Sequence, residues 1–428
     1  MQEITAVKEL LAKGELDSRL KSIYVDEKRV PYNRQRYIDA IERFSELFPE
    51  EKEIEIYSAP GRSEVCGNHT DHQNGMVLAT SINLDAIAIV AKTDDNKISL
   101  VSGDFPMVEL SLDDLGLKEN ELGTTIALIR GVAAKIAENG HAIGGFKAYV
   151  TSDVLIGAGM SSSAAFESLI GTILSGLYND MGISSVEIAQ VGQYAENVYF
   201  GKPCGLMDQM ACSVGGMIYI DFADKTSPVV KQITSDFEGA DLSLCITDTK
   251  GSHADLTPDY AAVPAEMNSV AEAMGKEHLR EVDRSAFFAE LPRLWKETSG
   301  RAVLRAIHFF NEEERVLAAA NALEASDYDT FLANIKASGE SSLKYLQNVY
   351  SPKQVDSQNV TVALAVSENV LGADGGVCRV HGGGFAGTIQ AFVKDDVVDT
   401  YKETLEAVFG ADSCHVLKVR LYGGIRVM

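Results

Sequence analysis

The sequence predicts an α+β protein, in which strands and helices mix without the strict alternation of a doubly wound parallel sheet. Residues 1–48 carry apolar side chains at helical spacing, and residues 53–151 contain several runs with strand character. Helical patterns dominate residues 260–347, and the last stretch returns to strand, glycine-rich loop, strand, helix and strand. A chain of 428 residues has room for about two or three domains. We place one boundary near residue 225, between residues 1–225 and 226–428.

The single elements follow from local patterns along the chain. The segment KEIEIYSAPGR is predicted as a short strand that is broken by Pro60 and Gly61. The run SSSAAFESLIGTILSGLY begins with serines whose oxygens can cap a helix, and Asn311 is a suitable cap for the helical pattern NEEERVLAAANAL. We expect further strands at 85–92, 97–102, 146–151, 214–221 and 242–247, and helices at 161–178 and 185–198.

The charge balance restricts the partners of the protein. There are 38 Lys and Arg residues against 62 Asp and Glu residues, which gives a formal net charge of −24. So acidic a surface repels phosphate backbones and anionic lipids, and we expect neither nucleic-acid nor membrane partners. The apolar runs are too short for a membrane span, and the first twenty residues mix acids and bases, unlike a secretory signal.

The cysteines indicate the compartment. Six of them are scattered along the chain, without a CxxC pair. In a chain of this length such cysteines are typical of reduced thiols in a cytoplasmic protein. We expect the protein to act there as a monomer.

A glycine- and serine-rich segment, LIGAGMSSSAA at 155–165, lies between a predicted strand and a predicted helix. Gly157 and Gly159 lack a Cβ, so the backbone can approach a ligand closely, and the start of the helix presents unpaired N–H groups. This combination suits an anion such as a phosphate group. The segment lacks the GK[ST] ending of a Walker A loop and the GxGxxG pattern of dinucleotide loops. A glycine turn with a serine cap is the alternative interpretation.

A second segment, APGRSEVCGNHTDHQNG at 59–75, is very polar and is bounded by glycines. Arg62, Asn68, His69, Asp71 and His72 lie within eleven residues. Many directional donors and acceptors at this density suit a small hydroxylated ligand. A solvated loop rich in turn-forming residues is the alternative.

Two further segments stand out. Asp208 follows a glycine- and proline-containing loop and is flanked by Leu206, Met207 and Met210. An acid in apolar surroundings usually has a cationic partner or a catalytic task, although it can also cap a helix. The run HGGGFAG at 381–387 indicates a backbone that bends sharply or approaches another group closely.

Together these segments resemble the galactokinases of the GHMP small-molecule kinase superfamily. GRSEVCGNHTDHQNGMVLA is similar to the galactokinase signature, LIGAGMSSSAA to the superfamily phosphate loop, AENVYFGKPCGLMDQ to the family's AE…G…CGIMDQ stretch, and GGGFAG to GGGFGG. RAIHFFNEEERV is similar to a further family helix. The similarity spans roughly residues 55–395, with the motifs in family order.

The resemblance implies phosphorylation of the anomeric hydroxyl of galactose by MgATP. It implies two α+β lobes with the site between them: a ribosomal-protein-like N-terminal lobe that binds sugar and nucleotide, and a ferredoxin-like C-terminal lobe. Asp208 would be the catalytic acid residue with Arg62 as its partner, both also touching the sugar. The other implied contacts are Asn68, His69, Asp71, Gly205 and Tyr260 for the sugar, Gly157, Gly159, Ser161, Ser162 and Ser163 for ATP, and Ser162 and Glu196 for Mg²⁺.

The chain departs from the family pattern in its sugar motif. Asn68 stands where galactokinases carry a glutamate that bonds the sugar's 6-hydroxyl, and Ser63 and Glu64 replace the usual Val-Asn. Asn68 can still bond a hydroxyl but no longer repels a 6-carboxylate, so a galacturonate kinase is an open alternative. A sugar and ATP sensor without catalysis is a second alternative, which the retained serine loop, Arg62 and Asp208 disfavour. The full sugar motif disfavours other branches such as mevalonate or homoserine kinases.

Overall fold

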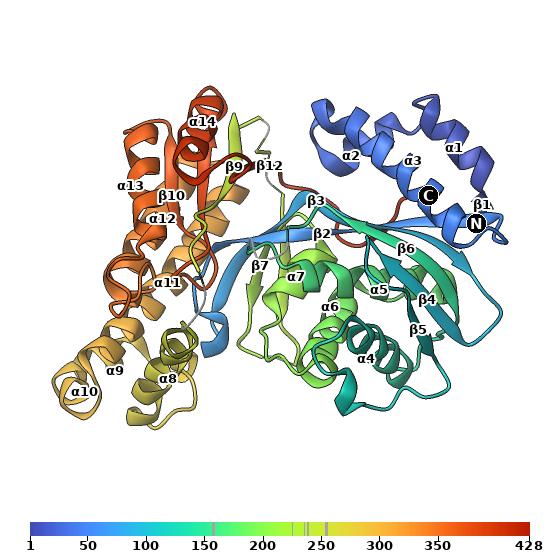
Figure 1. Ribbon diagram of the computed structural model, residues 1–428. Helices are drawn as coiled ribbons and strands as arrows, with labels where there is room; N and C mark the ends of the chain where they lie inside the picture. Colours follow the sequence, from blue (N-terminus) through green and yellow to red (C-terminus); the bar gives the residue numbers. More distant parts are fainter. Residues whose placement is uncertain (156–158, 225, 235, 238, 253–255) are drawn as a thin grey trace.

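The computed structural model describes residues 1–155, 159–224, 226–234, 236–237, 239–252 and 256–428. It shows an α+β protein in which two lobes lie side by side (Figure 1). Gly157, one of the predicted phosphate-loop residues, lies outside the described residues. The α+β class predicted from the sequence is confirmed.

A nine-stranded sheet forms the first lobe. Its centre is the antiparallel pair β2 (Glu53–Cys66) and β3 (Met76–Lys92), and the main strand order is β1-β2-β3-β6-β4-β5. Beyond this path β13 pairs with β2, and β7 pairs with both β3 and β8. The remaining strands are β1 (Gln2–Glu3), β4 (Lys97–Ser102), β5 (Val108–Ser111), β6 (Phe146–Ser152), β7 (Met217–Asp221), β8 (Val229–Ile233) and β13 (Ile425–Arg426).

Helices cover both faces of this sheet. Alternate residues of β3 point to opposite faces, so Ile87 and Ile89 pack against α1–α3 while Ala88 and Val90 pack against α4–α6. This explains why the strand reads as one continuous apolar run. The helices are α1 (Ile4–Ala12), α2 (Asp17–Tyr24), α3 (Val30–Leu47), α4 (Thr125–Glu138), α5 (Ser162–Asn179), α6 (Ser185–Tyr194), the π-helical η4 (Ala195–Phe200) and α7 (Met207–Val214).

The second lobe contains a four-stranded antiparallel sheet in the order β10-β11-β9-β12. Leu244 and Phe392 pack on the side of α11 and α12, and Cys245 and Ala391 pack on the side of α13 and α14. Helices α8–α10 lie at the far end of α11 (Figure 1). The elements are α8 (Thr257–Ala273), α9 (Arg284–Ala289), α10 (Leu291–Glu297), α11 (Gly300–Glu324), α12 (Tyr328–Ser341), α13 (Asn359–Leu371), α14 (Val398–Phe409), β9 (Leu242–Asp248), β10 (Gly376–Val380), β11 (Thr388–Lys394) and β12 (Cys414–Leu417).

Short helical turns complete the described chain. The 3₁₀ turns are η1 (Glu27–Arg29), η2 (Asp71–Gln73), η3 (Glu119–Glu121) and η5 (Leu279–Glu281), and η6 (Ser342–Leu346) is π-helical. Among the described residues, no helix combines the length and the hydrophobicity needed to span a bilayer.

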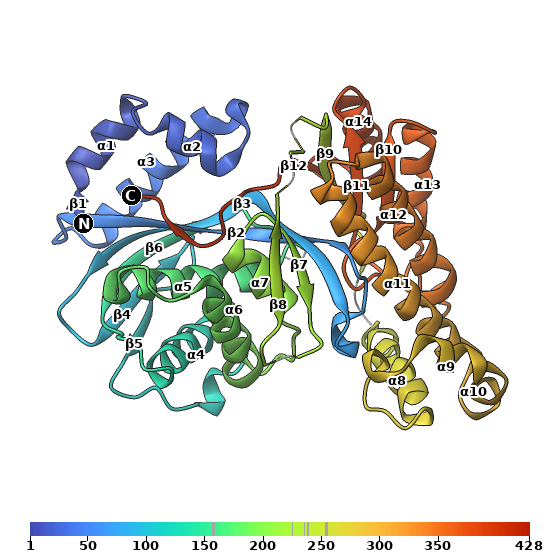
Figure 2. The ribbon, with the colours of Figure 1, turned by 180° about the vertical axis from the view of Figure 1, so that it is seen from behind.

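The adjoining ends of β2 and β3 reach from the first lobe toward α11 of the second (Figure 2). Three residues on one side of α11 hold the loop between these strands. His308 Nε2 lies 2.9 Å from the carbonyl oxygen of Asn68, so it donates there. Glu312 accepts from the backbone N–H of Gly67 at 3.0 Å, and Glu313 accepts from that of Met76 at 2.6 Å. The segment RAIHFFNEEERV, which resembles a family helix, therefore lies in α11 and holds the polar motif in place.

Two expectations differ from the structure in physical detail. The strand β2 does not stop at Pro60 but continues to Cys66, because register shifts beside Arg62 and Glu64 absorb the irregular backbone. Asn311 lies inside α11, whose cap is Ser299, with its Oγ 3.1 Å from the backbone nitrogen of Ala302. The lobe boundary near residue 225 remains a prediction, and strand pairing favours a position beyond β8.

A buried charge cluster ties the C-terminal segment to the first lobe. Asp85 on β3 is fully buried and accepts from Arg36 Nη1 at 2.6 Å and from Arg420 Nη1 at 2.9 Å. Burial would raise the pKa of Asp85, but the two guanidinium groups hold it below its ordinary value. After Arg420, the chain adds β13 to the edge of β2.

His308 generates a prediction about acid stability. Burial lowers its pKa from 6.5 to about 4, so the folded protein binds fewer protons than the unfolded chain between these values. Its stabilising contribution is therefore complete above pH 6.5 and is lost as the pH falls toward 4. His308→Gln should reduce the pH slope of the unfolding free energy by up to about 1.4 kcal/mol per pH unit in this window.

Chemical unfolding of both proteins between pH 7 and pH 5 measures this slope. Equal slopes for wild type and His308→Gln would contradict the assignment of a neutral, buried His308.

Candidate active site

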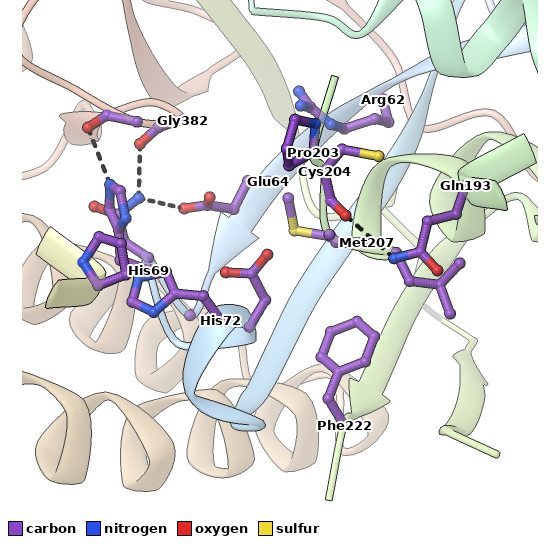
Figure 3. Close-up of a pocket in the computed structure, with 17 residues that line it drawn as sticks. Arg62, Glu64, His69, His72, Gln193, Pro203, Cys204, Met207, Phe222 and Gly382 are labelled. Carbon is purple, nitrogen blue, oxygen red and sulfur yellow. Dashed lines mark hydrogen bonds between the residues drawn. The ribbon is translucent and has the colours of Figure 1, made fainter. Parts of the chain in front are cut away.

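A pocket of about 630 Å³ opens between the two lobes. Strand β2, the loop after it, the segment 203–207 and the glycine loop at 382–383 line this pocket (Figure 3). Of the predicted site residues, those that line it are Arg62, Asn68, His69, Asp71 and Gly205. The polar motif at 59–75 and the segment before Asp208 therefore meet in space, although they are far apart in sequence.

Arg62 and Asp208 form a bidentate ion pair. Arg62 Nε donates to Asp208 Oδ1 at 2.6 Å, and Nη2 donates to Oδ2 at 2.6 Å. Burial would raise the pKa of Asp208, but the adjacent guanidinium group and its hydrogen bonds hold it below its ordinary value. Asp208 also lies in the first turn of α7, where the helix dipole favours a negative charge. The pairing that the family resemblance implies is present in the structure.

The same arginine holds the phosphate-loop segment. Arg62 Nη1 donates to the carbonyl oxygen of Gly159, and the backbone N–H of Arg62 donates to the carbonyl oxygen of Met160 at 3.2 Å. Gly159 has a φ of +68°, and a Cβ on it would lie 2.9 Å from Thr388 Oγ1 of the second lobe. Glycine is therefore required there both by conformation and by space.

Ser161 does not cap α5 as the sequence pattern predicts. Its φ of 53° and ψ of 63° are left-handed, and its hydroxyl donates to Asp208 rather than to the start of the helix. No side chain of the described residues thus caps the N-terminus of α5. Free N–H groups at the positive end of a helix of 18 residues form a favourable site for phosphate groups.

Glu196 lies beside the first turn of α5. Its Oε1 accepts from Ser163 Oγ at 3.1 Å and from Lys202 Nζ at 2.9 Å, while its Oε2 accepts from Gln209 Nε2 at 2.8 Å. The serine that contacts Glu196 is thus Ser163, the neighbour of Ser162, which was predicted as a metal ligand together with Glu196. Among the described residues, no group of three or more His, Cys, Asp or Glu side chains is arranged to hold a metal ion.

Glu167 is a buried acid that the sequence analysis did not single out. Gln209 Nε2 also donates to Glu167 Oε2 at 3.0 Å, and Glu167 Oε1 is buried without a hydrogen-bond partner in the described part of the chain. Burial and the nearby Glu196 raise the pKa of Glu167 well above its ordinary value. The only sequence signal for this residue is a glutamate within the apolar helix SSSAAFESLIG.

The amide of Asn68 is fully engaged by the protein. Its Nδ2 donates to Glu64 Oε1 at 2.9 Å and to the carbonyl oxygen of Gly382 at 2.7 Å. Its Oδ1 accepts from Asn348 Nδ2 at 2.8 Å and from Ser342 Oγ at 3.3 Å. These bonds use the two donors and both lone pairs of the amide. The expected contact of Asn68 with a sugar hydroxyl thus has no free group in this structure.

The other predicted sugar contacts lie close to the glycine loop or to the segment before α7. His69 Nε2 donates to the carbonyl oxygen of Gly383 at 3.0 Å. A Cβ on Gly205 would lie 2.5 Å from Asp71 Oδ2, so the absence of a side chain there lets this carboxylate approach. The Tyr260 hydroxyl donates to the carbonyl oxygen of Gly384 at 2.7 Å, and Tyr260 is absent from the residues that line the pocket.

The second lobe contributes an arginine that the sequence analysis missed. Arg379 on β10 is fully buried, and its Nη2 donates to Glu64 Oε1 at 2.9 Å. Gln390 Nε2 donates to Ser63 Oγ at 2.6 Å and to the carbonyl oxygen of Glu64 at 2.7 Å. Two of the positions that depart from the family pattern, Ser63 and Glu64, are therefore hydrogen-bonded to β10 and β11. A cation just before HGGGFAG is the signal that could have indicated Arg379.

Comparison with known proteins agrees with this geometry. Residues 127–216 match the family model described as the GHMP kinases N terminal domain, and residues 42–92 match the galactokinase galactose-binding signature. A galactokinase from Streptomyces coelicolor is 32% identical over 375 residues, which cover 86% of this chain and 92% of that protein.

Solved structures show the same relationship. The galactokinase of Lactococcus lactis, crystallised with galactose, is similar with a TM-score of 0.75 and 25% identity, covering 90% of this chain and 98% of that one. The mevalonate kinase of Methanococcus jannaschii shares the fold alone, with a TM-score of 0.60 and 16% identity over 86% of this chain and 98% of that one. Fold and site thus define a GHMP kinase. Within this class the chain belongs to the galactokinase family, whose members are ATP-dependent sugar kinases.

Proposed function

We propose that the protein transfers the γ-phosphoryl group of ATP to the anomeric hydroxyl of galactose, giving galactose 1-phosphate and ADP. The observation that carries this proposal is the position of the Arg62–Asp208 pair. Arg62 lines the sugar-sized pocket, while Arg62 and Ser161 connect the pair to the start of α5. A hydroxyl in the pocket and a phosphate at the helix end would therefore meet beside Asp208.

Asp208 orients the C1 hydroxyl of the sugar. A carboxylate whose pKa is lowered is a weak base, so it accepts a hydrogen bond from the hydroxyl more readily than it removes the proton outright. As the bond from C1 oxygen to phosphorus forms and the bond to the β-phosphate oxygen breaks, the hydroxyl becomes far more acidic. Its proton then passes to Asp208 late in the transfer.

Arg62 and the uncapped end of α5 stabilise the transferring group. The guanidinium keeps Asp208 ionised and places a fixed positive charge beside the phosphoryl oxygens. The N–H groups at the start of α5 receive the other phosphate oxygens. These donors are held in place before the nucleotide binds, so little reorganisation is needed during transfer.

Magnesium fits the acidic side of this site. The ammonium group of Lys202 contacts Glu196 Oε1 at 2.9 Å, beside Ser163, and this contact supports a role of the carboxylate in binding a cation. Ser162 and Glu196 supply the oxygen ligands that Mg²⁺ prefers. When bound, the ion would neutralise charge on the nucleotide phosphates.

The reaction is tested by ADP release with a panel of sugars. Galactose should give the highest kcat/KM among galactose, N-acetylgalactosamine, galacturonate and arabinose, because the pocket is lined by hydroxyl-binding groups. Product analysis should place the phosphate on C1. Absence of ADP release with every sugar would refute the proposed activity and favour a non-catalytic sensor.

Asp208→Asn should lower kcat about 100-fold or more, as expected when a positioned acid–base group is lost. The amide keeps the size of the side chain, so the variant should still fold and bind nucleotide, with a lower melting temperature because the buried Arg62 loses its charged partner. Turnover near that of wild type would show that Asp208 has a structural role only.

Ser162→Ala and Glu196→Ala should each raise the Mg²⁺ concentration needed for half-maximal activity on the order of tenfold. The KM for the sugar should change far less, since neither residue lines the pocket. Glu138→Ala, at an exposed position of α4, is a matched control. Unchanged magnesium dependence together with an altered sugar KM would reassign both residues to the sugar side.

A further inference from the structure

The pocket contains a carboxylate that no catalytic step uses. Glu64 lines the pocket, and its Oε1 accepts from both Asn68 Nδ2 and Arg379 Nη2 at 2.9 Å. Its other oxygen, Oε2, accepts no hydrogen bond from the described part of the chain, and it is not among the buried unpaired atoms. In Figure 3 the Glu64 side chain lies among the residues that surround the cavity. An ionised oxygen there can accept a hydrogen bond but cannot donate one.

Asn68 holds this carboxylate in place. The Asn68 amide has acceptors on its Nδ2 side, Glu64 and the Gly382 carbonyl, and donors on its Oδ1 side, Asn348 and Ser342. Exchanging the oxygen and nitrogen of the amide would set acceptor against acceptor, so its orientation is determined. Asn68 therefore positions Glu64 and has no remaining group for a sugar.

The distance along β2 suits a hexose. Arg62, Ser63 and Glu64 keep a regular register with β3, so Arg62 and Glu64 project from the same face two residues apart. Two residues of a strand span roughly 6–7 Å, about the length of a sugar from its C1 oxygen to its opposite end. A sugar with C1 at Asp208 would thus present its far end to Glu64.

We propose that Glu64 is the specificity residue of this kinase, accepting a hydrogen bond from the 6-hydroxyl of galactose and excluding a 6-carboxylate. This inference rests on the proposed function and deepens it. The family pattern has asparagine at position 64 and glutamate at position 68, and this chain has the reverse. The acidic residue is thus at position 64 instead of position 68, and a hydrogen bond joins the two side chains. The pocket therefore keeps an acidic group that faces the sugar. Neutral galactose-type sugars with a C6 hydroxyl are the substrate class, and the galacturonate alternative loses its basis.

The charges around Glu64 agree with this assignment. Arg379 balances the charge of Glu64 from the side of the second lobe and is fully buried, so it cannot reach a ligand carboxylate. On the pocket side the other nearby acid is Asp71. A uronate would bring a second carboxylate to Glu64 Oε2 without a proton to share. Galactose instead offers a hydroxyl hydrogen.

The test compares kcat/KM for galactose, 6-deoxygalactose and galacturonate in wild type and in Glu64→Gln. The amide introduced by this substitution keeps its oxygen toward Asn68 and Arg379, which turns the pocket-facing acceptor into a donor. We expect the variant to lose about tenfold or more on galactose, the range for a hydrogen bond to a charged group. It should stay within about twofold on 6-deoxygalactose, and its preference for galactose over galacturonate should fall about 100-fold. Equal losses on galactose and 6-deoxygalactose would overturn the proposal.

Glu53→Gln is the matched control, because Glu53 is an exposed glutamate on the same strand. It should keep the wild-type values on all sugars. Melting temperature and ATP binding of each variant show whether it folds.

A charge swap tests the same point without removing the carboxylate. Asn68→Glu alone places two acids side by side and should lower activity on galactose at least tenfold. The double variant Glu64→Asn/Asn68→Glu restores the family arrangement and should recover most of that loss. A double variant no better than Asn68→Glu would contradict the coupling of the two positions.

The wild-type protein separates this proposal from the proposed function. ADP release with no sugar refutes the kinase activity itself. Equal kcat/KM for galactose and galacturonate in an active enzyme overturns only the assignment of Glu64. If Glu64→Gln fails to fold, the wild-type sugar comparison and the charge swap still decide the question.

Discussion

The bidentate pair between Arg62 and Asp208 is the interaction on which the rest of the site depends. The third nitrogen of the Arg62 guanidinium, Nη1, donates to the carbonyl oxygen of Gly159. One side chain therefore connects β2, the phosphate-loop segment and α7. The left-handed backbone of Ser161 also serves this pair, because it directs the hydroxyl to Asp208. Within the described part of the chain, the first turn of α5 therefore lacks the hydrogen bond of a side-chain cap, and its backbone N–H groups can bind a phosphate group instead.

The sugar motif belongs to the first lobe but is held largely by the second. His308, Glu312 and Glu313 of α11 bond the backbone of the loop, while Arg379 and Gln390 bond the end of β2. Because most of these groups are buried, a loss of one partner leaves a polar group unsatisfied. The shape of the pocket is therefore coupled to the relative position of the two lobes.

Much of this organisation could be predicted from the sequence. The α+β class, the family and the meeting of four motifs follow from periodicity and from residues in a specific order. The sequence did not predict the partners of several polar side chains, among them Ser161 and Asn68. The serine at the start of α5 is a good cap by local rules, yet Ser161 prefers a carboxylate that lies 47 positions away. Asn68 and Glu64 are two separate departures from the family pattern in the sequence, and only the structure reveals the hydrogen bond that joins their side chains. Hydrogen bonds between residues far apart in the chain produce no periodic pattern in the sequence, so sequence analysis cannot predict them.

The return of the C-terminal segment to the first lobe has a consequence for biosynthesis. Arg420 completes the charge balance of Asp85, and β13 completes the edge of β2. A ribosome releases these residues only after the whole second lobe has been made, so the first lobe emerges with a buried aspartate short of one of its two arginines. Its sheet therefore reaches its final state only after the second lobe has been synthesised, and until then the nascent first lobe exposes part of the edge of β2.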